Sequence, residues 1–397
     1  MPSETTPDTG QARFRLTIAR RIFLVLLGPI AGFLAISLYL VAEKRQTVTE
    51  MAEVSELIAI ATHVSNLVHE WQKERGASAV FLGSKGTQLV QELPAQRQLT
   101  DKARAQLDQA QAGLNTAAIG HEFAETLREA MGLVGQIAGK RQEISTQAIA
   151  APVSNVYFTT TIGRLLDVVT EAAKRIASPE IANAVTGYVG FMQAKERAGQ
   201  ERATGAPGFA AGKFDAAQHR RFIGVVADQQ TYFRVFNQYA TPAQREFLAL
   251  SVAGEPVREV ERMRALAIEA GPGGDLKGTE GPYWFKMTTA RIDMMRTVED
   301  RLAADLAREA AAIGGAATRA FWITLAVCLG LAALAIMVGL AIARSITRPV
   351  AAMTGAMERL AGGDTGVEVP ARARRDEIGT MAKAVQVVKE TALEAAR

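Results

Sequence analysis

The sequence predicts an all-α protein in which a long helical segment lies between two apolar helices and is followed by a coiled-coil module. Composition is the first indication, because 48% of the 397 residues are hydrophobic but only 6% are aromatic, and β-branched runs are few. Such a composition favours helix over sheet. The second indication is a pair of long uncharged runs. The third is that the sequence shows no alternating strand pattern.

The first uncharged run, residues 22–42, predicts a membrane-spanning helix. At about 1.5 Å per residue it measures roughly 30 Å, the thickness of the apolar part of a bilayer. A cleaved signal peptide is the alternative. It fits less well, because the run exceeds the usual apolar region of about 7–15 residues and no small-x-small cleavage site follows it. The polar residues 1–12 before the run are expected to be disordered.

The second uncharged run, residues 320–343, predicts a second spanning helix. Basic residues precede the first run and follow the second. Those before the first run are Arg13, Arg15, Arg20 and Arg21, and those after the second are Arg344 and Arg348. Because basic flanks stay in the cytoplasm, we expect both termini there, with residues 1–21 as a cytoplasmic tail. Residues 43–319 should then form a domain outside the membrane.

The outer segment is expected to be helical nearly throughout. A helix over about 43–82 would continue out of the first span, and a helix over about 282–319 would continue into the second. Gly- and Pro-containing stretches predict breaks between helices, one of them at Thr204–Gly208. Gln72–Ser78 resembles Ala194–Gln200. This internal repeat predicts a bundle of two similar halves.

A module of two short helices follows the second span. Ile346, Val350, Met353, Met357 and Leu360 form the apolar stripe of the first helix, and Ile378, Met381, Val385 and Val388 form that of the second. Gly362-Gly363 ends the first helix and Asp376–Gly379 opens the second. Two heptad stripes need a partner, so we expect a parallel homodimeric four-helix coiled coil over residues 344–397. Two amphipathic helices lying on the membrane are the alternative.

Arginines on the apolar faces of helices are the candidate binding residues. Helical spacing places Arg75 and Arg291 on faces that are otherwise apolar, and Arg202 on a face that it shares with Phe191, Lys195 and Gly199. Arg197 lines up with Glu201 instead, as an ordinary surface pair would. All four arginines are candidates for binding an anion.

Two interpretations of the inward arginines remain open, because a buried cation without a partner is costly. Arg75 and Arg202 could pair with buried carboxylates on neighbouring helices, such as Glu74, Glu196 or Glu201. Alternatively they converge on a small anion, for which the planar fork of arginine is well suited. Gly76 and Gly199 would then allow close helix approach or ligand access.

Other classes of function find little support in the sequence. The net charge of +4 is small and dispersed, so no nucleic-acid partner is expected. One cysteine, Cys328, and four scattered histidines provide no metal-ligand spacing. The sequence contains no phosphate-binding glycine loop, nucleophile elbow or zinc helix motif. We therefore expect no catalytic residues, no metal and no cofactor, and a protein that is not an enzyme.

The sequence resembles the NIT family of nitrate- and nitrite-sensing domains. Glu70–Gly83 and Lys195–Ala203 resemble its two signature helices, and Tyr157–Val169 and Trp284–Leu302 resemble other helices of the domain. The similarity covers about residues 50–310. Residues 341–394 resemble a HAMP linker, with Pro349 and the Asp376-Glu-Ile-Gly379 signature in place.

This resemblance implies a bacterial inner-membrane homodimer with a helical periplasmic sensor that binds nitrate or nitrite through arginines between helices. By position Arg75 and Arg202 match best and Arg197 next, whereas Arg291 is a candidate on its helix face only. The order of parts resembles a chemotaxis receptor. Such a receptor continues into a signalling coiled coil, so we expect either a shortened receptor or output through a cytoplasmic signalling partner.

Two other functions stay open. One is a ligand-free helical scaffold that binds a partner protein in the periplasm or the membrane. The other is the sensory part of a histidine kinase or a cyclase.

Overall fold

The computed structural model describes residues 18–114 and 119–395, and every regular element in these ranges is a helix. The predicted all-α class is confirmed, whereas the expectation for residues 1–12 lies outside the described residues. The helices are α1 (Ile18–Gly83), α2 (Glu92–Ala112), α4 (His121–Gly135), α5 (Ile137–Ser145), α6 (Ala151–Lys174), α7 (Pro179–Ala210), α8 (Ala216–Tyr239), α9 (Pro242–Ser251), α10 (Glu255–Ala270), α11 (Gly281–Ala361) and α12 (Glu377–Ala395).

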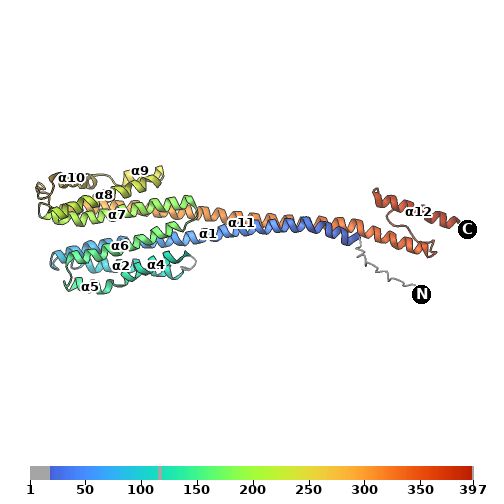
Figure 1. Ribbon diagram of the computed structural model, residues 1–397, viewed down its shortest axis with the longest axis horizontal. Coiled ribbons are helices and arrows are strands. Elements are labelled where there is room, and N and C mark those ends of the chain that lie inside the picture. Colours follow the sequence, from blue (N-terminus) through green and yellow to red (C-terminus); the bar gives the residue numbers. More distant parts are fainter. Residues whose placement is uncertain (1–17, 115–118, 396–397) are drawn as a thin grey trace, which may run out of the picture. The chain divides into compact units, whose positions relative to one another are not determined.

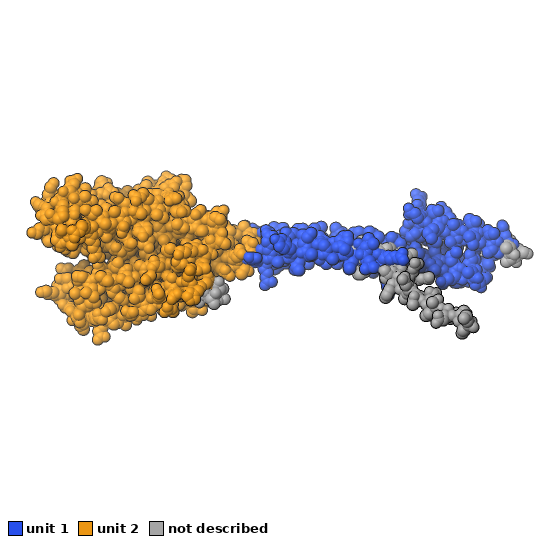
Figure 2. Space-filling model, viewed as in Figure 1, with its two compact units in different colours: residues 1–46, 318–397 blue, residues 47–317 orange. Residues whose placement is uncertain are grey.

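The chain divides into two compact units (Figure 2). Residues 47–317 form the bundle unit, and residues 1–46 with 318–397 form the terminal unit. Helices α1 and α11 each contribute to both units, as the sequence predicts. Both helices contain a stretch that is long and apolar enough to cross a membrane.

The bundle unit consists of two groups of helices (Figure 1). The first half contains the outer part of α1 with α2, α4, α5 and α6, and the second contains α7 to α10 with the outer part of α11. In the first half Trp71 packs edge-on against Phe158, 5.8 Å between ring centroids. In the second half Phe209 stacks on Trp284 at 4.6 Å. Each half therefore has its own aromatic centre, and the two similar halves are confirmed.

Helix starts in the second half follow local sequence signals. The Asp215 side chain accepts hydrogen bonds from the backbone of Ala217 and Gln218 at the start of α8. Thr241 and Gln244 form the same reciprocal capping arrangement at the start of α9. These side chains satisfy backbone N–H groups that the first turn of a helix leaves without partners.

The break predicted at Thr204–Gly208 is wrong, because α7 continues to Ala210 with Pro207 inside it. The two glycines of this stretch serve packing. A Cβ at Gly205 would lie 2.6 Å from the Trp284 indole, and a Cβ at Gly208 would lie 2.3 Å from the Phe214 ring. Large aromatic side chains thus occupy the space that the glycines leave, and this burial outweighs their poor helix propensity.

In the terminal unit Met353 of α11, Val369 of the connector and Ala382 of α12 form a small apolar core. Gly363 adopts φ 92°, just after α11 ends, a conformation that glycine adopts without strain. Asp376 accepts a hydrogen bond from the Gly379 N–H at 3.0 Å and so opens α12. The helix–connector–helix arrangement follows the sequence prediction, and the homodimer stays a prediction.

Candidate functional site

The candidate site is a cleft in the bundle unit to which α1 and α7 each contribute one buried arginine. Arg75 is 3% exposed and Arg202 is 8% exposed. Both line a cleft of about 550 Å³, together with Gly76, Gly199 and Phe285. The sequence prediction that Arg75 and Arg202 point inward is confirmed, and the cleft brings the two side chains together.

Arg75 is paired with a carboxylate of the other half. Its Nη1 and Nη2 donate to the two oxygens of Glu196 at 2.6 and 3.1 Å, and Nη1 also donates to Thr159 Oγ1 at 2.9 Å. Gln72 and Gln200 each donate one further hydrogen bond to Glu196, both at 2.8 Å. Both oxygens of the carboxylate are therefore fully engaged, and it is held by three side chains.

Arg202 has a different set of contacts. It donates to Thr289 Oγ1 at 2.8 Å, and its guanidinium lies over the Phe285 ring at 4.8 Å. Within residues 18–114 and 119–395, no carboxylate forms an ion pair with Arg202. Burial and the positive charge of Arg75 lower the pKa of Arg202 to about 10. Arg202 thus brings to the cleft a positive charge that an anion would stabilise.

Two glycines determine where the guanidinium groups lie. The Arg75 guanidinium packs on Gly199 of α7, where a Cβ would be 2.7 Å from Nη2. The Arg202 guanidinium packs on Gly76 of α1, where a Cβ would be 3.0 Å from Nη2. Each arginine therefore crosses to the opposite helix, and each needs a glycine there because a methyl group would occupy part of its space.

The structure corrects the register of the internal repeat. Glu74-Arg75 corresponds to Glu201-Arg202, so the resemblance between Gln72–Ser78 and Ala194–Gln200 is out of register. Arg141 binds Glu74 through Nε and Nη2 at 2.8 and 2.9 Å. Arg264 binds Glu201 in the same way, with both distances 2.8 Å. The two buried glutamates have equivalent partners because the halves are similar folds, which a short sequence match cannot reveal.

Thr159 and Thr289 extend this correspondence. They lie on α6 and α11, the last helix of each half, and each accepts a hydrogen bond from one of the cleft arginines. The contact between a cleft arginine and a threonine therefore occurs twice, once with the last helix of each half.

Arg197 and Arg291 lie outside the lining of the cleft. Arg197 lies 3.5 Å from Asp228 and stacks over the Tyr232 ring, so the predicted pair with Glu201 is wrong because Arg264 already binds that carboxylate. Arg291 is buried, as predicted. It donates to Gln229 at 2.9 Å and lies 3.6 Å from Glu201.

A second buried charged cluster joins α1, α7 and α11. Lys195 pairs with Glu299, and both side chains are at most 1% exposed. Ser65 donates to Glu299 at 2.7 Å, and Arg296 lies 3.4 Å from it. Burial lowers the pKa of Lys195. The sequence analysis missed this cluster, although helical spacing places Glu299 on the same face as Met295 and Leu302 and could have signalled it.

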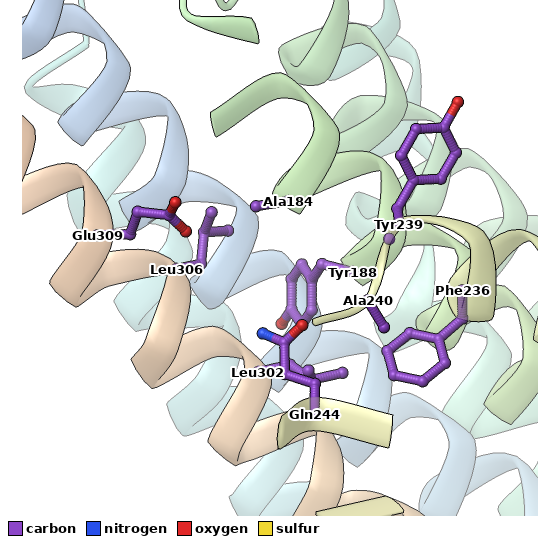
Figure 3. Close-up of a pocket in the computed structure, with 10 residues that line it drawn as sticks. Ala184, Tyr188, Phe236, Tyr239, Ala240, Gln244, Leu302, Leu306 and Glu309 are labelled. Carbon is purple, nitrogen blue, oxygen red and sulfur yellow. The ribbon is translucent and has the colours of Figure 1, made fainter. Parts of the chain in front are cut away.

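A second cavity in the bundle unit lies beside Tyr188, Leu302 and Glu309 (Figure 3). Its volume is about 10 Å³. That is room for one water molecule at most, so the cleft between the arginines is the better candidate for a ligand site.

Comparison with known proteins agrees with the sequence resemblance. The profile of the family described as "Nitrate and nitrite sensing" (NIT) matches residues 66–307, and that of the HAMP domain matches residues 341–391. The Nitrate regulatory protein of Klebsiella oxytoca is 32% identical over 266 residues, which are 66% of each chain. This chain thus spans just under two thirds of the length of that relative.

Two further similarities are informative. The "Probable chemoreceptor y4sI" of Sinorhizobium fredii is 42% identical over 62 residues, which are 16% of this chain and 8% of that protein. The solved structure described as "Structure of the NasR transcription antiterminator" superposes with a TM-score of 0.64 and 26% identity, covering 88% of this chain and 98% of that one. With the NIT profile matching more than half of its length, the chain belongs to the nitrate- and nitrite-sensing family and carries a HAMP domain after the NIT region.

Proposed function

We propose that this protein is a dimeric inner-membrane receptor that binds nitrate or nitrite between Arg75 and Arg202 and relays binding through its HAMP domain. Arg202 carries the proposal, because it is buried, lines the cleft and has no carboxylate partner among the described residues. Arg75 and Arg202 together carry two positive charges, and Glu196 offsets only one. A small monovalent oxyanion would supply the remaining charge and accept parallel hydrogen bonds from a guanidinium fork.

The relatives support the choice of anion and the type of protein. The name of the Klebsiella oxytoca relative refers to nitrate regulation, and the similarity to a probable chemoreceptor favours a receptor with a chemotaxis-type output. We propose the same two features for this chain.

The apolar stretches of α1 and α11 support a membrane location. Val25 and Leu38 are more than 70% exposed, and Trp322 and Leu329 more than 60%. Large apolar side chains exposed in this number favour a lipid environment over water. With the basic flanks, we propose spans over 22–42 and 320–343, a periplasmic sensor over 43–319 and cytoplasmic termini.

The helices that carry the site provide a route for signal transfer. Arg75 lies on α1, and Thr289 and Phe285, which contact Arg202, lie on α11. Both helices continue into the apolar stretches. A shift of α11 against α7 on anion binding would therefore reach the HAMP domain along one continuous helix.

A ligand-free scaffold is the second candidate function. The Arg75–Glu196 pair favours it, because a carboxylate already satisfies that arginine. A ligand-free scaffold leaves the charge of Arg202 unexplained, so we prefer the proposal of an anion-binding receptor. The sensory part of a kinase or cyclase would use the same site and differ only in output.

The decisive experiment is an anion titration of the full chain in detergent micelles, followed by thermal unfolding. Nitrate or nitrite should raise the melting temperature, because a ligand that binds only the folded state stabilises it. Arg202→Gln should weaken binding by about tenfold or more, since charge-assisted hydrogen bonds contribute roughly 1.5–3 kcal/mol.

The matched control is Arg164→Gln, which removes the same charge from an exposed ion pair with Asp167 on α6. It should leave the nitrate response unchanged. A wild-type chain that responds equally to chloride, or an Arg202→Gln chain that responds like wild type, would contradict the proposed function.

A further inference from the structure

The two halves of the site correspond in their Glu-Arg pairs, Glu74-Arg75 and Glu201-Arg202, but differ at the position of the carboxylate that binds across the cleft. Glu196 reaches across from α7 to Arg75 of α1. The equivalent position on α1, at the same spacing before Arg75 as Glu196 has before Arg202, is occupied by His69. Arg75 therefore faces a carboxylate of the opposite half, whereas the position that would supply a carboxylate to Arg202 carries an imidazole.

His69 is uncharged in these surroundings. Burial and the nearby charges of Lys195, Arg296, Lys73 and Arg202 lower its pKa to about 2. Its Nδ1 is buried and makes no hydrogen bond within the described residues. The imidazole thus contributes no charge to the cleft at neutral pH.

The other carboxylates near the cleft are either bound by arginines outside the cleft or screened by solvent, so they contribute little to its net charge. Glu74 is bound by Arg141, and Glu201 is bound by Arg264. Asp293 acts on Arg202 and raises its pKa, but it is exposed to solvent and forms no ion pair with Arg202 among the described residues, so screening weakens its field. The exposed Arg221 on the cleft wall is screened in the same way.

We propose that Glu196 sets the charge selectivity of the cleft. As a fixed internal anion it neutralises Arg75 and leaves one net positive charge, so the site favours a monovalent oxyanion over a divalent one. This inference rests on the proposed function and adds the residue that determines ligand charge. It rests on two observations. Glu196 and His69 occupy corresponding positions on α7 and α1 but carry different side chains, and four hydrogen bonds hold the Glu196 carboxylate in place.

The position of Glu196 suits this role. The carboxylate is 1% exposed, so water does not screen its charge. It also lies one turn from Gly199 on α7, against which the Arg75 guanidinium packs. A charge that is buried and held rigidly beside the cleft is screened less than a surface charge when it acts on a bound anion.

The test changes the charge of the site in both directions in the full chain, with nitrate and sulfate as probes. Glu196→Gln raises the net charge by one while keeping the size of the side chain. The preference for sulfate over nitrate should rise by about tenfold or more, because a unit charge beside a buried ligand is weakly screened. Asp228→Asn is the matched control, because it removes an exposed carboxylate outside the cleft and should leave the preference unchanged.

The reverse change is His69→Glu, which places a second carboxylate at the position on α1 that corresponds to Glu196, where the charge of Arg202 is felt. It should abolish nitrate binding, because both arginines would then have internal partners. This variant tests the proposal even if Glu196→Gln does not fold, and circular dichroism reports folding in each case.

The outcomes separate the two proposals. If the wild type binds nitrate but folded Glu196→Gln gains no preference for sulfate, or folded His69→Glu still binds nitrate, the charge-selectivity proposal is overturned and the proposed function stands. If the wild type binds neither nitrate nor nitrite, both are overturned.

Discussion

Removing Glu299 should destabilise the bundle unit strongly. Glu299 is the common partner of Lys195, Ser65 and Arg296 in the cluster that joins α7, α1 and α11. Glu299→Gln keeps an oxygen for the Ser65 hydroxyl but leaves the Lys195 ammonium without a carboxylate. Because the Lys195 side chain is 0% exposed, water cannot replace the lost partner.

The expected cost is about 3–5 kcal/mol, the range for removing one member of a buried ion pair. Arg296 adds little to it, because this side chain also pairs with Asp300 at 2.7 Å and is partly exposed. The cost comes from the buried ammonium, whose charged form burial already disfavours.

Chemical unfolding of the full chain in detergent, followed by circular dichroism, measures the effect. The double variant Lys195→Met/Glu299→Met should lose less stability than Glu299→Gln alone, because it removes both buried charges and fills the space with apolar atoms. A loss below about 1 kcal/mol for Glu299→Gln, or a larger loss for the double variant, would refute this account of the cluster.

Two further predictions concern backbone positions and pH. Gly199→Ala should weaken nitrate binding by about tenfold, because the new methyl group would displace the Arg75 guanidinium; Gly163→Ala, which meets no atom within 4 Å, should bind normally and unfold at a higher temperature. Hydrogen bonds from Arg374 and the Gly379 N–H lower the pKa of Asp376 from 3.8 to about 2. The stabilisation is therefore complete above about pH 4 and lost as pH falls towards 2, and the melting-temperature difference between wild type and Asp376→Asn should shrink over that interval.

Much of the fold could be predicted from the sequence because the signals are local. The uncharged runs, the heptad stripes around Met353 and Ile378, and the glycines after α11 each act within a few residues of themselves. The same holds for the inward direction of Arg75 and Arg202, since helical spacing alone decides which side chains share a face.

The partners of those side chains could not be predicted in this way. Arg75 and Glu196 are 121 residues apart in the chain, and Lys195 and Glu299 are 104 apart. Adjacent residues of α7 bind partners on different helices: Glu196 binds Arg75 of α1, and Lys195 binds Glu299 of α11. Only the packing of three helices brings these charges together.

The sequence by itself determined the class of fold, the two long apolar runs, the family and the two arginines that point inward, because local periodicity and motif residues specify them. The tertiary structure decided which arginine already has a carboxylate and which does not. It also decided the true register of the two halves, which made Glu74-Arg75 and Glu201-Arg202 equivalent and singled out Glu196. The physical reason is that a charge is neutralised by what lies near it in space, and the distances across a helix bundle are set by side-chain packing between its helices.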